Sequence, residues 1–407
     1  MTHVIRNGTE AQEVARKLAA SFAEQAAVRD SERRLPEAEL ADLSDSGLLG
    51  VTVPARFGGA AVEVSVLAEV FRTLATADGS LAQIPHSHFV FLEALRLQGT
   101  EEQQERFFAA ALAGARFANA QAERGGRTAA DDATTLRRRP EGGYRLDGEK
   151  FYSTGALFAD WLVVRAVLAD EAPSAPVAGG PASTPTPKAV AFVRRDTPGV
   201  TVQDDWAGMG QRTTASGTVL LDGVLVDEDQ VVPYTPIFAR PTTYGARAQV
   251  LHAALDVGIA RGALDAAVVQ VGRARPWFEA GVGRAAEEPL LVQQAGELEI
   301  LVRGAEALLR EAAAAIDAAE ADLTDDSTAR ASVATAVAKV AGARAAVEVS
   351  SALFELGGTR SAAEPLNLSR YWRDARTHTL HDPTRWKVQH VGRWLLSGTP
   401  PPRHGQL

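Results

Sequence analysis

Cysteine is missing from the 407-residue sequence altogether. Its absence excludes disulfides, thiolate metal sites and cysteine nucleophiles, and it fits a reducing cytoplasm, where we expect the protein. Apolar runs that approach the roughly 20 residues needed to cross a bilayer are missing too. The first residues hold no apolar core of the kind that signal peptides carry. We therefore expect neither secretion nor a membrane partner.

Basic residues form no continuous block, and the net charge is −9. Both observations argue against nucleic acid as a partner. The sequence also lacks a G-x-G-x-x-G or P-loop pattern, so it predicts no Rossmann or P-loop nucleotide site. It predicts no metal site either, because its one His-x-x-His pair supplies only two ligands.

What the sequence does contain is a helical pattern, then a β pattern, then a second helical pattern. Short alternating runs with glycine turns begin near residue 117, and long helical patterns return at Tyr244. We predict an α+β protein with an N-terminal helical domain (1–117), a middle β domain (118–235) and a C-terminal helical bundle (236–407).

Individual helices follow from the spacing of apolar residues and from capping patterns. Thr100 and Gln103 form the pattern of a capping box, which marks the start of a helix. Helices are expected over 10–28, 63–78, 80–97, 101–113, 244–274, 288–319, 327–356, 363–378 and 383–397. The Pro/Ala/Ser-rich residues 171–187 predict a mobile surface loop.

Histidines are the first candidates for chemistry. His378 and His381 lie three residues apart in RTHTLHDP, where Pro383 has to end or kink a helix. Both imidazoles then share one face and could exchange protons near neutral pH, although a helix C-cap explains them equally well. His86 and His88 point to different faces of an apolar helix, so we expect at most one to line a pocket. For either of them a satisfied core position is the commoner role.

Tyr152, Ser153 and Thr154 follow a predicted turn in GEKFYSTGALFADW. Their hydroxyl groups and backbone donors could hold a planar heterocycle, although the residues alone fit an ordinary strand edge better. Trp206 lies in a glycine-rich loop between strands. It could stack on a ring system or close the core of the β domain.

Two arginines are candidates for binding a phosphate. Arg360 follows a Gly-Gly-Thr break that ends with Thr359, and glycines allow the backbone to approach a ligand closely. Arg275 stands at the end of another predicted helix, before a Pro-Trp pair. A surface salt bridge is the commoner role for both side chains.

Four segments resemble the acyl-CoA dehydrogenase superfamily and occur in its order: SGLLGVTVPARFGGA, GEKFYSTGA, ELGGTR and RYWRDARTHTLHDP. The resemblance covers nearly the whole chain. It implies the acyl-CoA dehydrogenase fold, with an N-terminal helical domain, a middle β-barrel or sandwich domain and a C-terminal four-helix bundle. It also implies a homotetramer.

The last segment points to a subgroup. Dehydrogenases of this superfamily usually carry Tyr-Glu-Gly-Thr there, with the glutamate as base, whereas this chain has His381-Asp382-Pro383-Thr384. The segment instead resembles the flavin monooxygenases typified by dibenzothiophene monooxygenase. Further matches are ADGSL with His88, DDWA and ARPW. The segments LPEAEL, GLLGVTVP and KFYSTGALFADW are most similar to proteins of dimethyl sulfone and other organosulfur utilisation.

This resemblance implies roles for single residues around a flavin. Tyr152, Ser153 and Thr154 would border the isoalloxazine, with Thr154 near its N5 edge and Trp206 beside the pocket. Arg124 stands where dibenzothiophene monooxygenase has an asparagine, so the substrate lid differs in shape and charge.

The remaining implied roles concern the phosphate and the substrate. Arg275 and Arg360, with Thr359, would hold the flavin phosphate, one of the arginines coming from a neighbouring subunit. His88 and His381 would face the substrate side of the ring, with His378 in support and Tyr152 nearby.

The implied activity is that of a two-component monooxygenase. A separate NAD(P)H-dependent flavin reductase would supply reduced FMN, which reacts with O2 to a C4a-hydroperoxyflavin that oxygenates a small organosulfur or other heteroatom or aromatic substrate. FAD stays open as the flavin. Two alternatives also stay open: an FAD-dependent dehydrogenase with Asp382 as base, and a flavin-binding protein without turnover.

Overall fold

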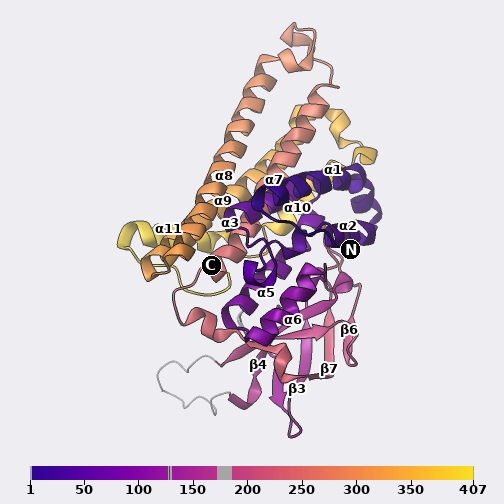
Figure 1. Ribbon diagram of the computed structural model, residues 1–407. Helices are drawn as coiled ribbons and strands as arrows, with labels where there is room; N and C mark the ends of the chain where they lie inside the picture. Colours follow the sequence, from indigo (N-terminus) through magenta and orange to yellow (C-terminus); the bar gives the residue numbers. More distant parts are fainter. Residues whose placement is uncertain (1, 127, 129–130, 172–185, 407) are drawn as a thin grey trace.

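The computed structural model describes residues 2–126, 128, 131–171 and 186–406. Most of the proline-rich stretch for which the sequence predicts a mobile loop, residues 172–185, lies outside this part. Within the described residues, helices come first, strands follow, and long helices complete the chain (Figure 1). This is the order of the predicted fold class, while the exact boundaries of the three domains stay predictions.

Six α-helices precede the sheet: α1 (Gly8–Glu32), α2 (Glu37–Asp45), α3 (Val64–Ala77), α4 (Gly79–Gln83), α5 (His86–Gln98) and α6 (Glu101–Leu112). The capping box of Thr100 and Gln103 is present at the start of α6. The single helix expected over 80–97 was wrong, because the chain breaks into α4 and α5 at Ile84 and Pro85. Proline lacks the N–H that would continue the helical hydrogen bonds.

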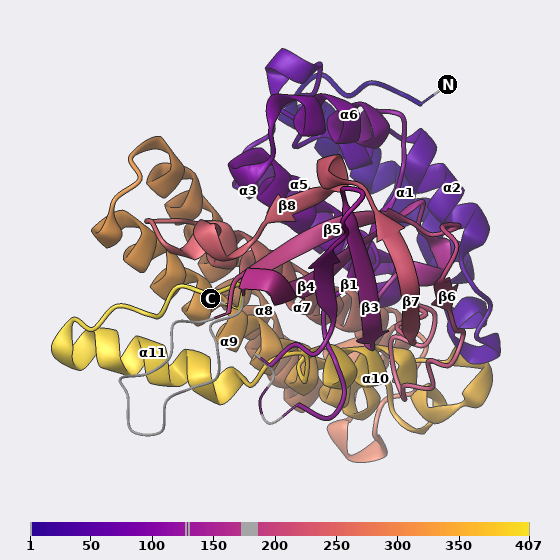
Figure 2. The same ribbon diagram turned by 90° about the horizontal axis from the view of Figure 1, so that it is seen from below.

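The strands are β1 (Phe117–Ala120), β2 (Thr135–Arg138), β3 (Tyr144–Lys150), β4 (Trp161–Leu168), β5 (Lys188–Arg194), β6 (Val200–Val202), β7 (Val219–Val226) and β8 (Val231–Pro233). They form one sheet in the order β6-β7-β3-β2-β4-β5-β8, and β1 pairs with β4 in parallel. Phe107 of α6 packs on Phe117, Trp161 and Phe192 of the sheet. Figure 2 shows the sheet in front of α10 and the bundle.

The C-terminal helices are α7 (Tyr244–Val271), α8 (Pro289–Ala321), α9 (Asp325–Gly357), α10 (Ser369–His378) and α11 (Thr384–Ser397). Helix α7 is buried along most of its length and packs against α3 and α9. Figure 1 shows α7, α8 and α9 rising together, with the α7–α8 connection at the end farthest from the sheet. In the described part of the chain, no helix is both long enough and apolar enough to cross a membrane.

A substitution at Gly258 tests the close packing of α3 against α7. A Cβ atom at this position would overlap the backbone oxygen of Arg72 and lie 2.6 Å from the Cβ of Ala75. We expect Gly258→Ala to lower the free energy of unfolding by about 1–3 kcal/mol, because a tightly packed interface cannot take another methyl group. Urea denaturation measures the change.

Gly392 on α11 provides the control, because a Cβ atom there would meet nothing within 4 Å. Gly392→Ala should stabilise the protein by about 0.5–1 kcal/mol, since alanine loses less backbone entropy than glycine in a helix. Equal effects of the two substitutions would contradict the packing argument.

Candidate functional site

A cluster of four histidines lies where α5, α7 and α10 meet. His378 is the last residue of α10 and His381 follows in the next turn. The ring of His252, on α7, lies between those of His86 and His381, with centroids 3.9 Å and 4.1 Å away. Its Nδ1 is 2.9 Å from Nε2 of His378. The rings of the two histidines of the RTHTLHDP segment lie 6.5 Å apart, and both contact the ring of His252.

The cluster rests on a buried ion pair. Asp256, one turn after His252 on α7, accepts hydrogen bonds from His378 Nδ1 at 2.5 Å and from Lys339 Nζ at 3.0 Å. Burial raises the pKa of Asp256, but the charge of Lys339 and the hydrogen bonds from His378 and Lys339 outweigh burial and lower it. Burial lowers the pKa of His252 and His378 and brings that of His86 to about 3. The carboxylate is therefore ionised, and the buried imidazoles are neutral.

His88 faces away from this cluster. Its Nε2 donates to the backbone oxygen of Leu49 at 2.7 Å, and its Nδ1 accepts from the backbone N–H of Phe117 at 3.3 Å. Burial lowers the pKa of His88 to about 4 despite the bond to Leu49. Both ring nitrogens thus have backbone partners, which is the satisfied core arrangement. The side chain does line a mostly apolar hollow next to Gly155, so its predicted place near the substrate stays a prediction.

Asp382 follows His381 and is buried. Its carboxylate lies 2.8 Å from Nζ of Lys387 and 3.5 Å from Nδ1 of His381. Burial raises the pKa of Asp382, but the interaction with His381 and the charges of Lys339 and Lys387 outweigh it and lower the pKa. A carboxylate held in its ionised form by these cations is a weak proton acceptor.

Tyr152 marks a second region, at the end of β3. Its backbone is left-handed, with φ of 55°, which is rare and costly for a bulky side chain and is typical of functional sites. The Tyr152 side chain is nevertheless 55% exposed. Its ring packs edge-on against Phe151 at 4.6 Å and Trp206 at 6.2 Å, and the Arg124 guanidinium covers the Phe151 ring at 3.2 Å. These side chains form an aromatic edge in which Tyr152 and Arg124 are exposed, Trp206 is half-buried and Phe151 is buried.

Hydroxyl groups line the same end of the sheet. Thr154 Oγ1 and Ser216 Oγ are 2.8 Å apart, and Ser216 continues to Thr214 at 2.7 Å. Ser153 is fully buried, and its Oγ has no hydrogen-bond partner among the described residues. A buried hydroxyl without a partner is costly, so one that persists points to a missing bonding partner.

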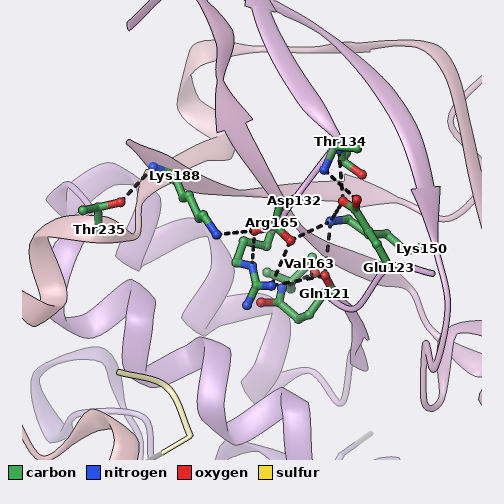
Figure 3. Close-up of polar contacts among 10 residues, drawn as sticks. Gln121, Glu123, Asp132, Thr134, Lys150, Val163, Arg165, Lys188 and Thr235 are labelled. Atoms are coloured by element: carbon green, nitrogen blue, oxygen red, sulfur yellow. Dashed lines mark hydrogen bonds and ion pairs between the residues drawn. The ribbon is translucent and has the colours of Figure 1, made fainter. Parts of the chain in front are cut away.

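A buried charge network lies around Lys150 at the end of β3, two residues before Tyr152 (Figure 3). Lys150, at the end of β3, donates to Gln121 O at 3.2 Å and to Glu123 at 2.6 Å. Asp132 lies 3.7 Å from Lys150 and accepts from Arg165 and Lys188 at 2.9 Å and 2.7 Å. Lys150 therefore anchors the segment just before Arg124 to the strand that ends just before Tyr152.

The candidate phosphate ligands lie apart from both regions. Arg275, Thr359 and Arg360 are exposed, and no ion pair between described residues involves either arginine. Arg275 belongs to the α7–α8 connection at the far end of the long helices (Figure 1). Along α7 alone, His252 and Val271 are about 28 Å apart at 1.5 Å per residue. The structure therefore does not bring Arg275 together with the histidines of its own chain.

The carboxylate of Asp374 helps to connect the loop that holds Trp206 to α10. Asp374 Oδ1 accepts a hydrogen bond from the backbone N–H of Gln211 at 2.5 Å. Trp206 Nε1 donates to Gln211 O at 2.9 Å. Burial, and then the charge of Asp30, raises the pKa of Asp374 to about 7. The aromatic edge and the histidine cluster are thus coupled through α10.

Comparison with known families assigns most of the described fold. Three family descriptions match in order: acyl-CoA dehydrogenase, N-terminal domain (residues 8–115), middle domain (118–224) and C-terminal domain (250–386). The chain belongs to the acyl-CoA dehydrogenase family.

Several similar relatives of the chain are monooxygenases. Dibenzothiophene monooxygenase of Rhodococcus qingshengii is 34% identical over 402 residues, covering 95% of this chain and 93% of the relative. The probable FMNH2-dependent monooxygenase SfnC of Pseudomonas putida is 31% identical and covers 95% of each chain. FMN-bound TdsC of Paenibacillus sp. A11-2 superposes with a TM-score of 0.89 at 31% identity, over 98% of this chain and 100% of TdsC. The chain stands in the flavin-dependent monooxygenase subgroup of the acyl-CoA dehydrogenase fold.

The aromatic edge suits the flavin of an acyl-CoA dehydrogenase fold. Tyr152 offers an exposed ring on a strained backbone, and the unpartnered Ser153 hydroxyl and the Thr154–Ser216 pair offer polar groups beside it. An aromatic ring with polar groups beside it offers a planar heterocycle both stacking and hydrogen bonds. The assignment of single residues to the flavin stays a prediction. No group of three histidine, aspartate or glutamate residues in the described part is placed to hold a metal ion.

The sequence reasoning missed His86, His252 and Asp256 as members of one cluster. It expected at most one of His86 and His88 to line a pocket, and the resemblance assigned His88 to the substrate side. The signal for His252 was available: a histidine and an aspartate four residues apart in an otherwise apolar helix share one buried face. Such a pair has to find polar partners on neighbouring helices.

Removing Lys150 tests the buried charge network. Lys150→Met leaves the side chain of Glu123, which is 8% exposed, without its cation. We expect a loss of about 3–5 kcal/mol in the free energy of unfolding, because an unpaired buried charge is costly. The double variant with Glu123→Gln should recover part of the lost stability. Urea denaturation measures both changes.

The control for this prediction is an exposed pair on the same strand, Arg145 with Asp147. Arg145→Met should cost no more than about 1 kcal/mol, because water screens exposed ion pairs. A loss as large as that of Lys150→Met would mean that burial of the network is not what matters.

Replacing Asp374 with asparagine should remove a pH dependence of stability. Its pKa is raised to about 7, so the folded protein retains a proton that the unfolded chain releases near pH 4. This stabilisation is complete below pH 4 and is lost as the pH rises to 7, by up to about 1.4 kcal/mol per pH unit. Urea denaturation from pH 5 to 8 gives the difference in the free energy of unfolding between the variant and the wild type. This difference should change in favour of the variant up to pH 7 and stay constant above it. A difference that is the same at every pH would contradict the raised pKa of Asp374.

Proposed function

We propose that this chain is the oxygenase component of a two-component, FMN-dependent monooxygenase that oxidises a small organosulfur compound. The observation that carries the proposal is the pairing of Asp382, together with the histidine cluster beside it. In the family's dehydrogenases, a glutamate in this segment acts as the base. Here the carboxylate is buried against Lys387, and imidazoles occupy the surroundings.

Bound reduced FMN would supply the electrons that activate O2 for transfer of one oxygen atom. The protein's part is to orient the ring, exclude water and hold protons at fixed atoms. We place Tyr152, Ser153, Thr154 and Trp206 along the isoalloxazine, with Arg124 beside them. His381, whose side chain is 41% exposed, is the member of the cluster that can exchange protons with water.

Binding of the flavin phosphate requires a second copy of the chain in this proposal. Arg275 and Arg360, with Thr359, are exposed and free of ion pairs among the described residues, as a phosphate ligand should be. Arg275 belongs to the α7–α8 connection, at the end of the long helices that is farthest from the sheet (Figure 1). Apolar side chains are exposed around it and along α8: Val268, Val269, Trp277, Phe278, Leu290, Val292 and Ile300. Exposed apolar surface of this extent favours an assembly, for which we propose a homotetramer.

Several parts of this proposal rest on the relatives. FMN is bound in the TdsC structure, and SfnC is named as FMNH2-dependent. A separate NAD(P)H-dependent flavin reductase then has to supply the reduced cofactor, and O2 is the second substrate. A cytoplasmic location stays a prediction from the sequence.

Oxygen-18 labelling tests the activity directly. The purified chain is mixed with FMN, NADH, a flavin reductase and 18O2, and dibenzothiophene or dimethyl sulfone is offered as substrate. We expect products carrying oxygen-18, and His381→Ala should slow their formation about 10²- to 10⁴-fold, the usual contribution of an acid–base group. His3→Ala, at an exposed pair with Glu10, is the control and should leave the rate unchanged.

The alternatives give different results in the same preparation. A dehydrogenase with Asp382 as base would purify with oxidised FAD that an acyl-CoA bleaches, and it would form no labelled product. A flavin-binding protein without turnover would bind FMN but show no difference between wild type and His381→Ala. Either result would overturn the proposal.

A further inference from the structure

A chain of buried polar side chains leads from α9 to the ring of His381. Lys339 of α9 donates to Asp256 of α7, which accepts a hydrogen bond from His378 of α10. His378 in turn contacts His252, which lies on α7 as well. All four side chains are almost completely buried. The surrounding packing therefore holds these four side chains in their series of contacts.

The contacts fix where the protons are. An ionised carboxylate only accepts, so Nδ1 of His378 carries the proton that points at Asp256. In a neutral imidazole the other nitrogen is then a lone pair, so Nε2 of His378 accepts the proton of His252 Nδ1. Nε2 of His252 is left as an acceptor. One carboxylate thus sets the tautomers of two histidines in series.

The ring of His252 is also what holds His381. The turn after α10 gives His381 only a backbone bond to His378, and its side chain is 41% exposed. The described contacts of its ring are with His252 and His378, at centroid distances of 4.1 Å and 6.5 Å, and with Asp382. On its other face, the His252 ring stacks on His86, which donates to Ala248 O. His381 therefore rests on a ring that cannot rotate.

We propose that His252 is a positioning residue: tied to Asp256 through His378, it orients the ring of His381 and presents an acceptor nitrogen to the site. The proposal rests on the proposed function, in which His381 acts on the bound molecules. Reactive groups act efficiently only when supporting residues hold them within about 0.5 Å of the productive geometry. Here the support extends through three helices. The titratable groups that face His252 are His86, Lys339, His378 and His381; Asp256 and Asp382 in turn contact His378 and His381.

Nuclear magnetic resonance of the flavin-free protein tests the tautomers without any turnover. Long-range ¹H–¹⁵N spectra of ¹⁵N-histidine-labelled protein should show His252 and His378 protonated at Nδ1 in the wild type. Asp256→Asn should move both protons to Nε2. The amide oxygen of the asparagine stays with Lys339, so its NH2 group faces His378 and donates to Nδ1. A wild-type His252 protonated at Nε2 would overturn the proposal, even if Asp256→Asn does not fold.

The steady-state kinetics of a His252 variant provide the second test. His252→Phe keeps a ring in the stack but removes both nitrogens. We expect kcat to fall about 10- to 100-fold, as for other outer residues that orient a reactive group. KM for the sulfur substrate should stay within about twofold, and the pH profile of kcat should change, because the loss is one of orientation and proton placement.

The two proposals fail in different ways. If the wild type forms no labelled product, the proposed function is wrong, while the tautomer measurement still decides the arrangement of His252. If the wild type is active and His252→Phe retains its kcat and pH profile, the positioning role is wrong and the monooxygenase stands. A variant with raised KM and unchanged kcat would also contradict the positioning role, since it would place His252 in substrate binding instead.

Discussion

The carboxylate of Asp256 is the point at which the helical bundle and the candidate site depend on each other. It is fully buried on α7 and holds Lys339 of α9 and His378 of α10. Neither a buried carboxylate nor a buried ammonium group is tolerated without its partner, because removal from water costs each several kcal/mol. The pair therefore fixes how α7, α9 and α10 face one another. His252, one helical turn earlier, takes its place as a consequence.

Helix α10 transmits this constraint to the β domain. Asp374 accepts the backbone N–H of Gln211, and Arg373 forms an ion pair with Asp30 of α1 and donates to Met209 O at 3.1 Å. Gly210 lies so close to the backbone of Arg373 that a side chain there would overlap it. The loop that carries Trp206 is thus seated on the helix that carries His378. A flavin along the aromatic edge and the histidine cluster would be held by a single framework.

Much of this could be predicted from the sequence, and the limits are physical. Spacing and caps gave the long helices and the capping box at Thr100, because these depend on neighbouring residues alone. The break at Pro85 has the same local origin and was overlooked. The meeting of His86 with His252 could not be derived this way, since periodicity identifies a buried face but not the helix that covers it. Likewise, the resemblance suggested His88, whose ring nitrogens both bond to the backbone.

The charges around the histidines bear on which reaction the fold can support. Abstraction of an α-proton requires a carboxylate that is free to accept it. Both carboxylates that the described residues place beside the stack, Asp256 and Asp382, are paired with buried lysines, and their pKa values are lowered. The buried imidazoles are neutral and offer hydrogen-bond donors and acceptors at fixed places, without a strong base. Proton exchange with water is then left to His381, the one exposed ring of the cluster. Such a site suits stabilising and protonating a reduced oxygen species better than removing a proton from carbon.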